Sequence, residues 1–323
     1  MGKETEIAWC DHTFNPWWGC VRVSPGCEHC YAETFSERVG LKVWGAKADH
    51  RRFGDKHWNE PHKWNRDAEK AGVRRRVFCA SMADVFEGRD EDAADRERLW
   101  TLIEETPWLD WLLLTKRPQN MIALAPERWA NQWPRNIWAG CTVEDQQRAD
   151  ERILQLRRVP AAVRFLSVEP MLGVVTLRRE WLRCPGGAEY GHGFHATTVH
   201  ADGCRERHAA ISWVIVGGES GPGARPFDLA WAESLSEQCR AAGVPYFFKQ
   251  AGAVPVLSEE SWRAMPSTPL LAARNRKQAP PGMVPLALKS KKGGDVAELA
   301  RAFPELAAAG VFRREWPATQ DGK

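Results

Sequence analysis

The sequence has no long apolar run, since no stretch reaches the roughly 18–20 apolar residues that a membrane-spanning helix needs. Its first residues, Met-Gly-Lys-Glu-Thr-Glu, contain no apolar segment of the signal-peptide kind, so we expect a cytoplasmic protein. Net charge is also small, because 45 Lys and Arg residues against 42 Asp and Glu residues leave +3 at pH 7. That balance argues against a protein that coats a polyanion with its whole surface.

Two common nucleotide-binding motifs are absent as well. The glycine-rich residues 217–226 have neither the glycine spacing of the dinucleotide-binding fingerprint nor the Lys-Ser/Thr pair of a P-loop. Such a loop either lets backbone amides approach an anion or cofactor, or forms a tight turn in which Glu219 and Arg225 pair structurally. Both interpretations are open, and Gly217, Gly218 and Glu219 are candidate cofactor-binding residues.

The composition is that of a protein with a large core. With 323 residues, 43% of them hydrophobic and 27% charged, the chain suffices for one large α/β domain or two of ordinary size. In a cytoplasmic setting its nine cysteines are expected to be thiols or metal ligands rather than disulfides.

Short β-rich runs alternate with helical patterns along the chain. Predicted strands cover residues 76–80, 111–114, 137–140, 163–166, 213–216 and 246–248, with a first strand within residues 7–14. Helices are expected at residues 91–105, 145–158 and 228–242. This alternation favours an α/β fold with a partial, TIM-like (β/α) barrel over a doubly wound sheet.

Polar side chains follow nearly every predicted strand. They are Ser81 and Asp84; Thr115, Lys116 and Arg117; Thr142, Glu144 and Asp145; Ser167 and Glu169; Gly217 to Ser220; and Lys249 and Gln250. A single cluster of this kind is an ordinary helix cap. Six in succession indicate a site built from the loops at the carboxyl ends of the strands, where barrel enzymes have their active sites.

Three further regions depart from the alternation. Residues 183–208 form a Gly- and His-rich insertion that either binds zinc or serves as a lid or partner-binding loop. Residues 50–65 interleave basic and aromatic residues in a predicted loop, which suits nucleic-acid binding or is a solvated face. Beyond residue 254 the chain is rich in Pro, Ala and basic residues, with one helix expected at residues 296–309. We therefore expect a barrel of residues 1–254 and a C-terminal appendage of residues 255–323.

Three cysteines lie within eleven residues just after the first predicted strand. Cys20, Cys27 and Cys30 are spaced Cys-x6-Cys-x2-Cys, and thiolates are strong ligands for soft metals. Three thiolates suit a 4Fe–4S cluster that keeps one iron open. A structural zinc would take a fourth ligand from a neighbouring His or Cys. The spacing alone leaves iron–sulfur, zinc and simple buried thiols open.

This segment resembles the cluster-binding loop of radical S-adenosylmethionine (SAM) enzymes, in particular the spore photoproduct lyase-like branch. The matching residues are Asn15, Pro16, Trp17, Gly19, Cys20, Cys27, Cys30, Tyr31 and Ala32. The loop differs from the usual Cys-x3-Cys-x2-Cys spacing by three extra residues between its first two cysteines. More closely, residues 4–254 resemble a phage and bacterial three-cysteine-motif family of unknown biochemical function.

The resemblance implies a radical-SAM type of barrel with a 4Fe–4S cluster on Cys20, Cys27 and Cys30, and with SAM on the open iron. It implies that Ser81 and Asp84 bind the amino group of SAM and that Lys116 binds its carboxylate. Further candidates for ribose, cofactor or substrate are Glu144, Ser167, Glu169, Gly217, Gly218 and Glu219. No residue is assigned a catalytic role.

The same resemblance implies an enzyme that cleaves SAM and modifies a substrate, with a nucleobase in DNA or RNA as the expected class. Expected partners are an electron-donating reductase, a nucleic acid and a partner protein encoded nearby. The alternative is a non-catalytic phage accessory or nucleic-acid-binding protein that carries a structural zinc in the three-cysteine loop.

Overall fold

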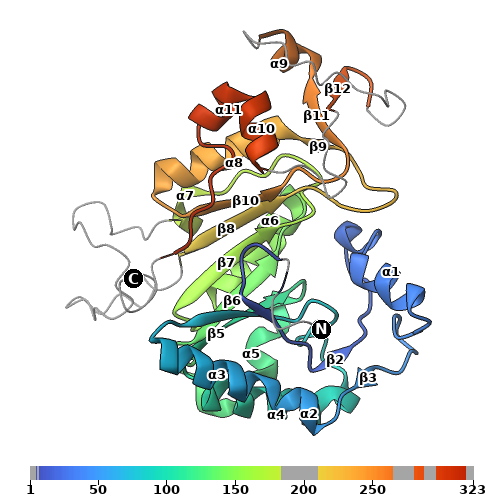
Figure 1. Cartoon of the computed structure of the whole chain (residues 1–323), viewed down its shortest axis with the longest axis vertical. Helices are drawn as coiled ribbons and strands as arrows, with labels where there is room; N and C mark the ends of the chain where they lie inside the picture. Colours follow the sequence, from blue (N-terminus) through green and yellow to red (C-terminus); the bar gives the residue numbers. More distant parts are fainter. Residues whose placement is uncertain (1–4, 6, 183–209, 265–279, 287–295, 318–323) are drawn as a thin grey trace, which may run out of the picture. The chain divides into compact units, whose positions relative to one another are not determined.

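The computed structural model describes residues 5, 7–182, 210–264, 280–286 and 296–317 (Figure 1). The predicted insertion at residues 183–208, with its Cys and His residues, lies outside the described residues. Within the described part of the chain, no helix has both the length and the apolar character needed to cross a membrane.

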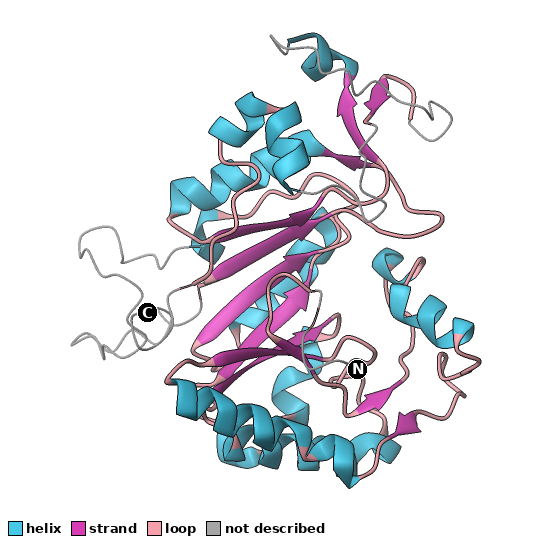
Figure 2. Cartoon of the chain, viewed as in Figure 1, coloured by secondary structure: helices cyan, strands magenta, loops and turns pink. Residues whose placement is uncertain are grey.

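The main element is a seven-stranded sheet with the strand order β1-β4-β5-β6-β7-β8-β10 (Figure 1, Figure 2). Its strands are β1 (His12–Thr13), β4 (Arg75–Cys79), β5 (Leu109–Thr115), β6 (Ile137–Thr142), β7 (Val163–Val168), β8 (Trp213–Gly217) and β10 (Tyr246–Gln250). The pairs β1/β4, β4/β5, β5/β6 and β8/β10 are parallel. A doubly wound sheet reverses its strand order, whereas the order here follows the chain throughout. The predicted α/β partial barrel is therefore confirmed, and each predicted strand is present.

Helices connect these strands, and three of them lie where the sequence predicts. The longer helices are α3 (Glu60–Ala71), α4 (Ala93–Glu105), α6 (Gln146–Arg157) and α8 (Leu229–Ala242), and the shorter ones are α1 (Tyr31–Arg38), α2 (Asp55–Trp58), α5 (Met121–Leu124) and α7 (Arg179–Leu182). Asp228 caps α8, because its carboxylate accepts a hydrogen bond from the Ala230 N–H at 3.0 Å. Gly243 ends the same helix with a φ of 68°, a left-handed conformation that glycine adopts readily.

Residues 50–65 are mostly helical, so the prediction of a basic and aromatic loop is wrong. They form β3 (Arg51–Arg52), which pairs with β2 (Trp17–Trp18), then α2 and the start of α3. Trp58 and Trp64 are 2% and 7% exposed, and Trp64 stacks on His12 with 4.4 Å between ring centroids. In α3, Trp64 and Ala68 are buried four residues apart, which is the spacing of one helix face. The two tryptophans are core residues and offer no platform for stacked bases.

The described residues of the C-terminal part add short helices and two strands of a small sheet. The three-stranded sheet has the order β12 (Met283–Pro285), β11 (Pro255–Ser258), β9 (Phe227–Asp228), and α9 (Glu259–Ala264) follows β11. The single helix expected at residues 296–309 is instead α10 (Val296–Ala302) and α11 (Pro304–Ala308). Pro304 lacks a backbone N–H and disfavours a helical conformation at Phe303, whose φ of −132° and ψ of 71° interrupt the helix.

The chain divides into two compact units. The first unit is Met1–Thr142 with Arg152–Phe165, and the second is Val143–Glu151 with Leu166–Lys323. The core of the first unit includes the fully buried side chains of Trp111, Leu112 and Leu113. That of the second includes Trp213 and Phe247, also fully buried. The expected border after residue 254 stays a prediction, although β11 just beyond it pairs with β9.

Candidate functional site

In the first unit, Asn15 ties the cysteine-containing loop to the end of β4. Asn15 is fully buried, and its Oδ1 accepts a hydrogen bond from the Met82 N–H at 2.7 Å. Its Nδ2 donates to Ser81 Oγ at 3.1 Å. Tyr31 directly follows the third cysteine, and its hydroxyl donates to the Ser81 carbonyl at 2.8 Å. Both ends of the loop are thus attached to the polar turn after β4.

Gly19, the residue before the first cysteine, lies in a space that excludes any side chain. Its N–H donates to the Met82 carbonyl at 3.0 Å, and its φ is 133°. A Cβ at this position would lie 2.2 Å from His50 Cδ2 and 2.5 Å from the Val43 carbonyl oxygen. Close approach and backbone conformation therefore both require glycine before Cys20.

Cys27 and Cys30 lie next to the start of α1. Cys27 ends a 3-10 turn, Pro25–Cys27, in which its N–H donates to the Ser24 carbonyl at 2.9 Å. Cys30 is the N-cap residue of α1, and its carbonyl accepts a hydrogen bond from the Thr34 N–H at 3.1 Å. Cys27 is buried, whereas Cys20 and Cys30 are half-buried.

The three thiols do not form a ready single-ion site. Among the described residues, no group of three or more His, Cys, Asp or Glu side chains is placed so that it could hold a metal ion. A single zinc ion needs its thiolates close together, because Zn–S distances are about 2.3 Å. In an iron–sulfur cluster each thiolate binds a different iron and the sulfurs lie farther apart. The assignment of Cys20, Cys27 and Cys30 as metal ligands stays a prediction.

Arg117 is a buried arginine beside Cys20. In the sequence it stands out only as one of the polar residues that follow a strand. Its Nη1 lies 3.7 Å from Cys20 Sγ and 2.8 Å from Asp84 Oδ2. Its Nη2 donates to the Val21 carbonyl at 2.6 Å. Only 7% of Arg117 is exposed. One planar guanidinium thus connects the segment after β5 to the first cysteine and to the turn after β4.

Asp84, expected to bind the amino group of SAM, is engaged within the first unit. Its two oxygens accept from Thr115 Oγ1 at 2.7 and 2.9 Å, and Oδ1 accepts from the Phe86 N–H at 3.0 Å. The Lys116 N–H lies 3.3 Å from Oδ2. The structure therefore brings together Asp84, the backbone of Lys116 and, through Arg117, Cys20. The expected contacts of Asp84 and Lys116 with SAM stay predictions.

Burial dominates the electrostatics around Cys20. Desolvation raises the pKa of the Cys20 thiol, the negative charge of Asp84 raises it further, and Arg117 opposes both. Desolvation acts to lower the pKa of the Arg117 guanidinium, but the neighbouring Asp84 carboxylate raises that pKa above its ordinary value. Arg117 is therefore a fixed positive charge beside the first cysteine.

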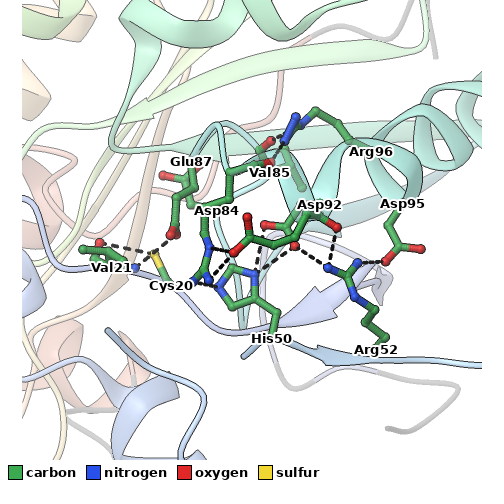
Figure 3. A network of polar contacts seen from close by, with 12 residues as sticks. Cys20, Val21, His50, Arg52, Asp84, Val85, Glu87, Asp92, Asp95 and Arg96 are labelled. Carbon is green, nitrogen blue, oxygen red and sulfur yellow. Dashed lines mark hydrogen bonds and ion pairs between the residues drawn. The ribbon is translucent and has the colours of Figure 1, made fainter. Parts of the chain in front are cut away.

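A second polar cluster lies beside Gly19 (Figure 3). His50 Nδ1 is 2.9 Å from Asp92 Oδ2, and both side chains are completely buried. His50 Nε2 is 3.2 Å from Arg89 Nη1. Because arginine can only donate hydrogen bonds, Nε2 must accept this one, so we assign the ring proton to Nδ1, which donates to Asp92. The imidazole is fixed in one orientation next to the turn that precedes Cys20.

In the second unit, Ser167, Glu169 and Gly217 come together with Lys249. Glu169 Oε2 accepts from Ser167 Oγ at 3.4 Å, and Glu169 Oε1 lies 3.1 Å from Lys249 Nζ. The latter contact is an ion pair without hydrogen-bond alignment. A Cβ on Gly217 would lie 2.5 Å from Glu169 Oε1, so glycine leaves the space that this carboxylate occupies.

The glycine-rich loop has the internal pairing that was one of its two interpretations. Glu219 Oε2 accepts from the Arg225 N–H at 2.9 Å and from Nε at 3.0 Å, while Oε1 accepts from Nη2 at 2.7 Å. A Cβ on Gly218 would lie 2.4 Å from the Ala251 carbonyl oxygen, so the close approach at this glycine is to backbone. Glu144 is fully buried, and its carbonyl accepts from the Leu172 N–H at 2.7 Å. A cofactor role for these residues stays a prediction.

The predicted site residues divide between the two units. Cys20, Cys27, Cys30, Ser81, Asp84 and Lys116 belong to the first, and Glu144, Ser167, Glu169, Gly217, Gly218 and Glu219 belong to the second. Sequence reasoning missed the roles of Arg117, His50 and Asp92. Arg117 had a signal, because it directly follows Thr115 and Lys116 at a strand end. His50 had none, since its partner Asp92 is 42 residues away.

Comparison with known families gives one match across most of the chain. A family model described as "Protein of unknown function (DUF5131)" matches residues 4–282. The chain belongs to the DUF5131 family. No curated protein matches this DUF5131 chain. The resemblance to a phage three-cysteine-motif family stays a prediction.

Three solved structures of spore photoproduct lyase have a weak likeness to the DUF5131 chain. A mutant with bound AdoMet and dinucleoside spore photoproduct has a TM-score of 0.40 and 14% identity, covering 92% of this chain and 73% of that one. A lyase complexed with dinucleoside spore photoproduct has a TM-score of 0.36 and 14% identity, and the match covers 93% of this chain and 72% of the lyase chain. A Cys-to-Ser mutant has a TM-score of 0.38 and 16% identity. That match covers 53% of this chain and 48% of the lyase chain, so it spans about half of the lyase. These scores are too low to transfer an activity.

Proposed function

We propose that this chain is a radical-SAM-like enzyme. Cys20, Cys27 and Cys30 bind a 4Fe–4S cluster, S-adenosylmethionine is its second cofactor, and a reductase donates the electron. The cysteine-loop resemblance supports this proposal, and so does the chemistry of the donor set, which is three thiols on a single loop. When bound, the cluster and SAM supply electron transfer and radical chemistry that no protein side chain provides.

The observation that carries the proposal is the connection from Cys20 through Arg117 to Asp84 and Thr115. It holds the first cysteine at the carboxyl ends of β4 and β5. In a barrel, this is the end at which cofactors and substrates bind. A structural metal site has no need of that location.

In this proposal, the chain's own residues hold the cysteine loop in place and orient the cofactor or substrate. Asn15 and Gly19 shape the cysteine loop, and Arg117 adds a fixed positive charge beside it. Ser81 and Lys116, at the ends of β4 and β5, are proposed contacts of SAM. In the second unit, Lys249 and Glu169 are a proposed polar pair for cofactor or substrate.

A nucleobase in DNA or RNA is the proposed substrate class. Its support is reduced, because burial of Trp58 and Trp64 removes the aromatic half of the expected nucleic-acid surface. Arg51 is exposed, and its guanidinium lies 4.7 Å from the Trp18 ring centroid. Arg51 is therefore an exposed basic residue of that surface, whereas His50 is buried against Asp92 and Arg52 pairs with Asp92 and Asp95.

Metal analysis of anaerobically purified and reconstituted protein tests the proposal. We expect about four irons and four sulfides per chain, broad visible absorbance and no stoichiometric zinc. Cys27→Ala should lose iron and absorbance. Cys239→Ala is the matched control, because Cys239 is a fully buried thiol of α8 in the second unit, and this variant should retain both. Zinc in place of iron, or full iron in Cys27→Ala, would refute the cluster assignment.

Cleavage of SAM tests the enzyme itself. With a strong chemical reductant, the iron-loaded protein should convert SAM to 5′-deoxyadenosine and methionine, and Cys27→Ala should form neither. An iron-loaded protein that binds SAM without cleaving it under these conditions would contradict radical-SAM catalysis.

A further inference from the structure

The backbone of Val21, the residue after Cys20, is held at both its N–H and its carbonyl within the first unit. The Val21 N–H donates to Glu87 Oε2 at 3.1 Å, and the Val21 carbonyl accepts from Arg117 Nη2 at 2.6 Å. Glu87 Oε2 and Arg117 Nη2 are themselves only 3.8 Å apart. Figure 3 shows Cys20, Val21 and Glu87 at one end of the polar network.

Both members of this clamp are withdrawn from solvent. The side chains of Arg117 and Glu87 are 8% and 4% exposed. Interactions between charges in such a place are little screened by salt, so they can fix a geometry. Asp84 in turn holds Arg117, with 2.8 Å between Asp84 Oδ2 and Arg117 Nη1.

Arg117 also contacts the sulfur of Cys20. Its Nη1 lies 3.7 Å from Sγ, and arginine can only donate. A metal-bound cysteine sulfur is a hydrogen-bond acceptor, so the contact suits a ligand. Donors to cluster sulfurs are one of the factors that set the reduction potential of the cluster.

We propose that Arg117 is the positioning residue for Cys20, through the Val21 clamp that it forms with Glu87. The proposal rests on the proposed function, in which Cys20 is the first cluster ligand. Arg117 makes its contacts with Asp84, Val21 and Cys20 from two different nitrogens of one rigid fork. Lysine carries the same charge on a single point and cannot reproduce this geometry.

Hydrogen exchange of the metal-free full chain tests the clamp directly. In Arg117→Met and Arg117→Lys, the amide of Val21 should exchange about tenfold faster than in the wild type, because Glu87, the acceptor of this amide, loses the buried guanidinium that holds it and the Val21 carbonyl loses its donor. Arg74→Met is the matched control, because Arg74 pairs at 2.6 Å with the buried Asp110 elsewhere in the first unit. It should leave Val21 exchange unchanged. Unchanged exchange in both Arg117 variants would overturn the proposal.

Reconstitution with iron and sulfide provides the second readout. Arg117→Lys keeps a positive charge next to Asp84, so it should fold. The variant should nevertheless bind less iron per chain, and the cluster it does hold should have a shifted reduction potential. Arg74→Met should match the wild type in both. An iron-loaded Arg117→Lys with the wild-type potential would also overturn the proposal. A wild-type chain that takes up no iron would instead refute the proposed function, and the metal-free exchange experiment separates the two failures.

Discussion

The imidazole of His50 fills the space that a side chain on Gly19 would need. A Cβ on Gly19 would lie 2.2 Å from His50 Cδ2, and the ring cannot easily move away. Asp92 holds it at 2.9 Å on one nitrogen, and Arg89 approaches the other at 3.2 Å. The turn before Cys20 is therefore shaped by a buried histidine from another part of the first unit.

Gly19→Ala should destabilise the protein more than Gly45→Ala. Both glycines have a positive φ, 133° and 109°, so each substitution should cost about 1–3 kcal/mol of backbone strain. A Cβ on Gly45 meets nothing within 4 Å, whereas one on Gly19 clashes with His50 and with the Val43 carbonyl. The free energies of unfolding in urea measure the difference. Equal losses for the two variants would contradict the tight contact at Gly19.

Gly217→Ala should destabilise the second unit because of Glu169. The added Cβ would lie 2.5 Å from Glu169 Oε1, which predicts a cost of about 1–3 kcal/mol from overpacking. In a Glu169→Ala background the obstructing atom is absent, and the same substitution should cost less, with a coupling of about 0.5–3 kcal/mol. Urea unfolding of the four proteins in this cycle measures the coupling. Additive effects would show that the carboxylate is not the obstacle.

Asp228 should make the stability of the protein depend on pH in the acid range. Burial raises the pKa of its carboxyl group, which the Ala230 N–H only partly offsets. The folded state thus binds a proton that the unfolded state releases, so the contribution of this group is present at low pH. It is lost as the pH rises from the ordinary Asp value through the raised folded value.

Replacing Asp228 separates its charge from its role as a helix cap. Asp228→Asn keeps a cap acceptor and should be at least as stable as the wild type near pH 7, with a flatter pH profile. Asp228→Ala loses the cap of α8 and should cost about 1 kcal/mol. Unfolding free energies at about pH 3 and pH 7 measure both effects. Equal losses in the Asn and Ala variants would contradict this assignment.

Much of the fold was predictable because its signals are local. Strands β4 to β10 of the main sheet are short apolar runs, and α8 has both a cap at Asp228 and a stop at Gly243. The helix in residues 60–71 was missed, because its charged and aromatic residues were interpreted as a nucleic-acid-binding loop. The break at Pro304 was missed as well, although proline is a strong local signal.

The sequence by itself determined the alternation of strands and helices, the location of the three-cysteine loop and the polar residues at the strand ends. Those features depend on neighbours along the chain. Only the tertiary structure decided which polar groups pair with one another. Asp84 and Arg117 are 33 residues apart and Arg117 and Cys20 are 97 apart, and they meet because parallel strands bring their carboxyl ends to one edge of the sheet. Once they meet, burial makes each charge require a partner, and that requirement selects the pairs.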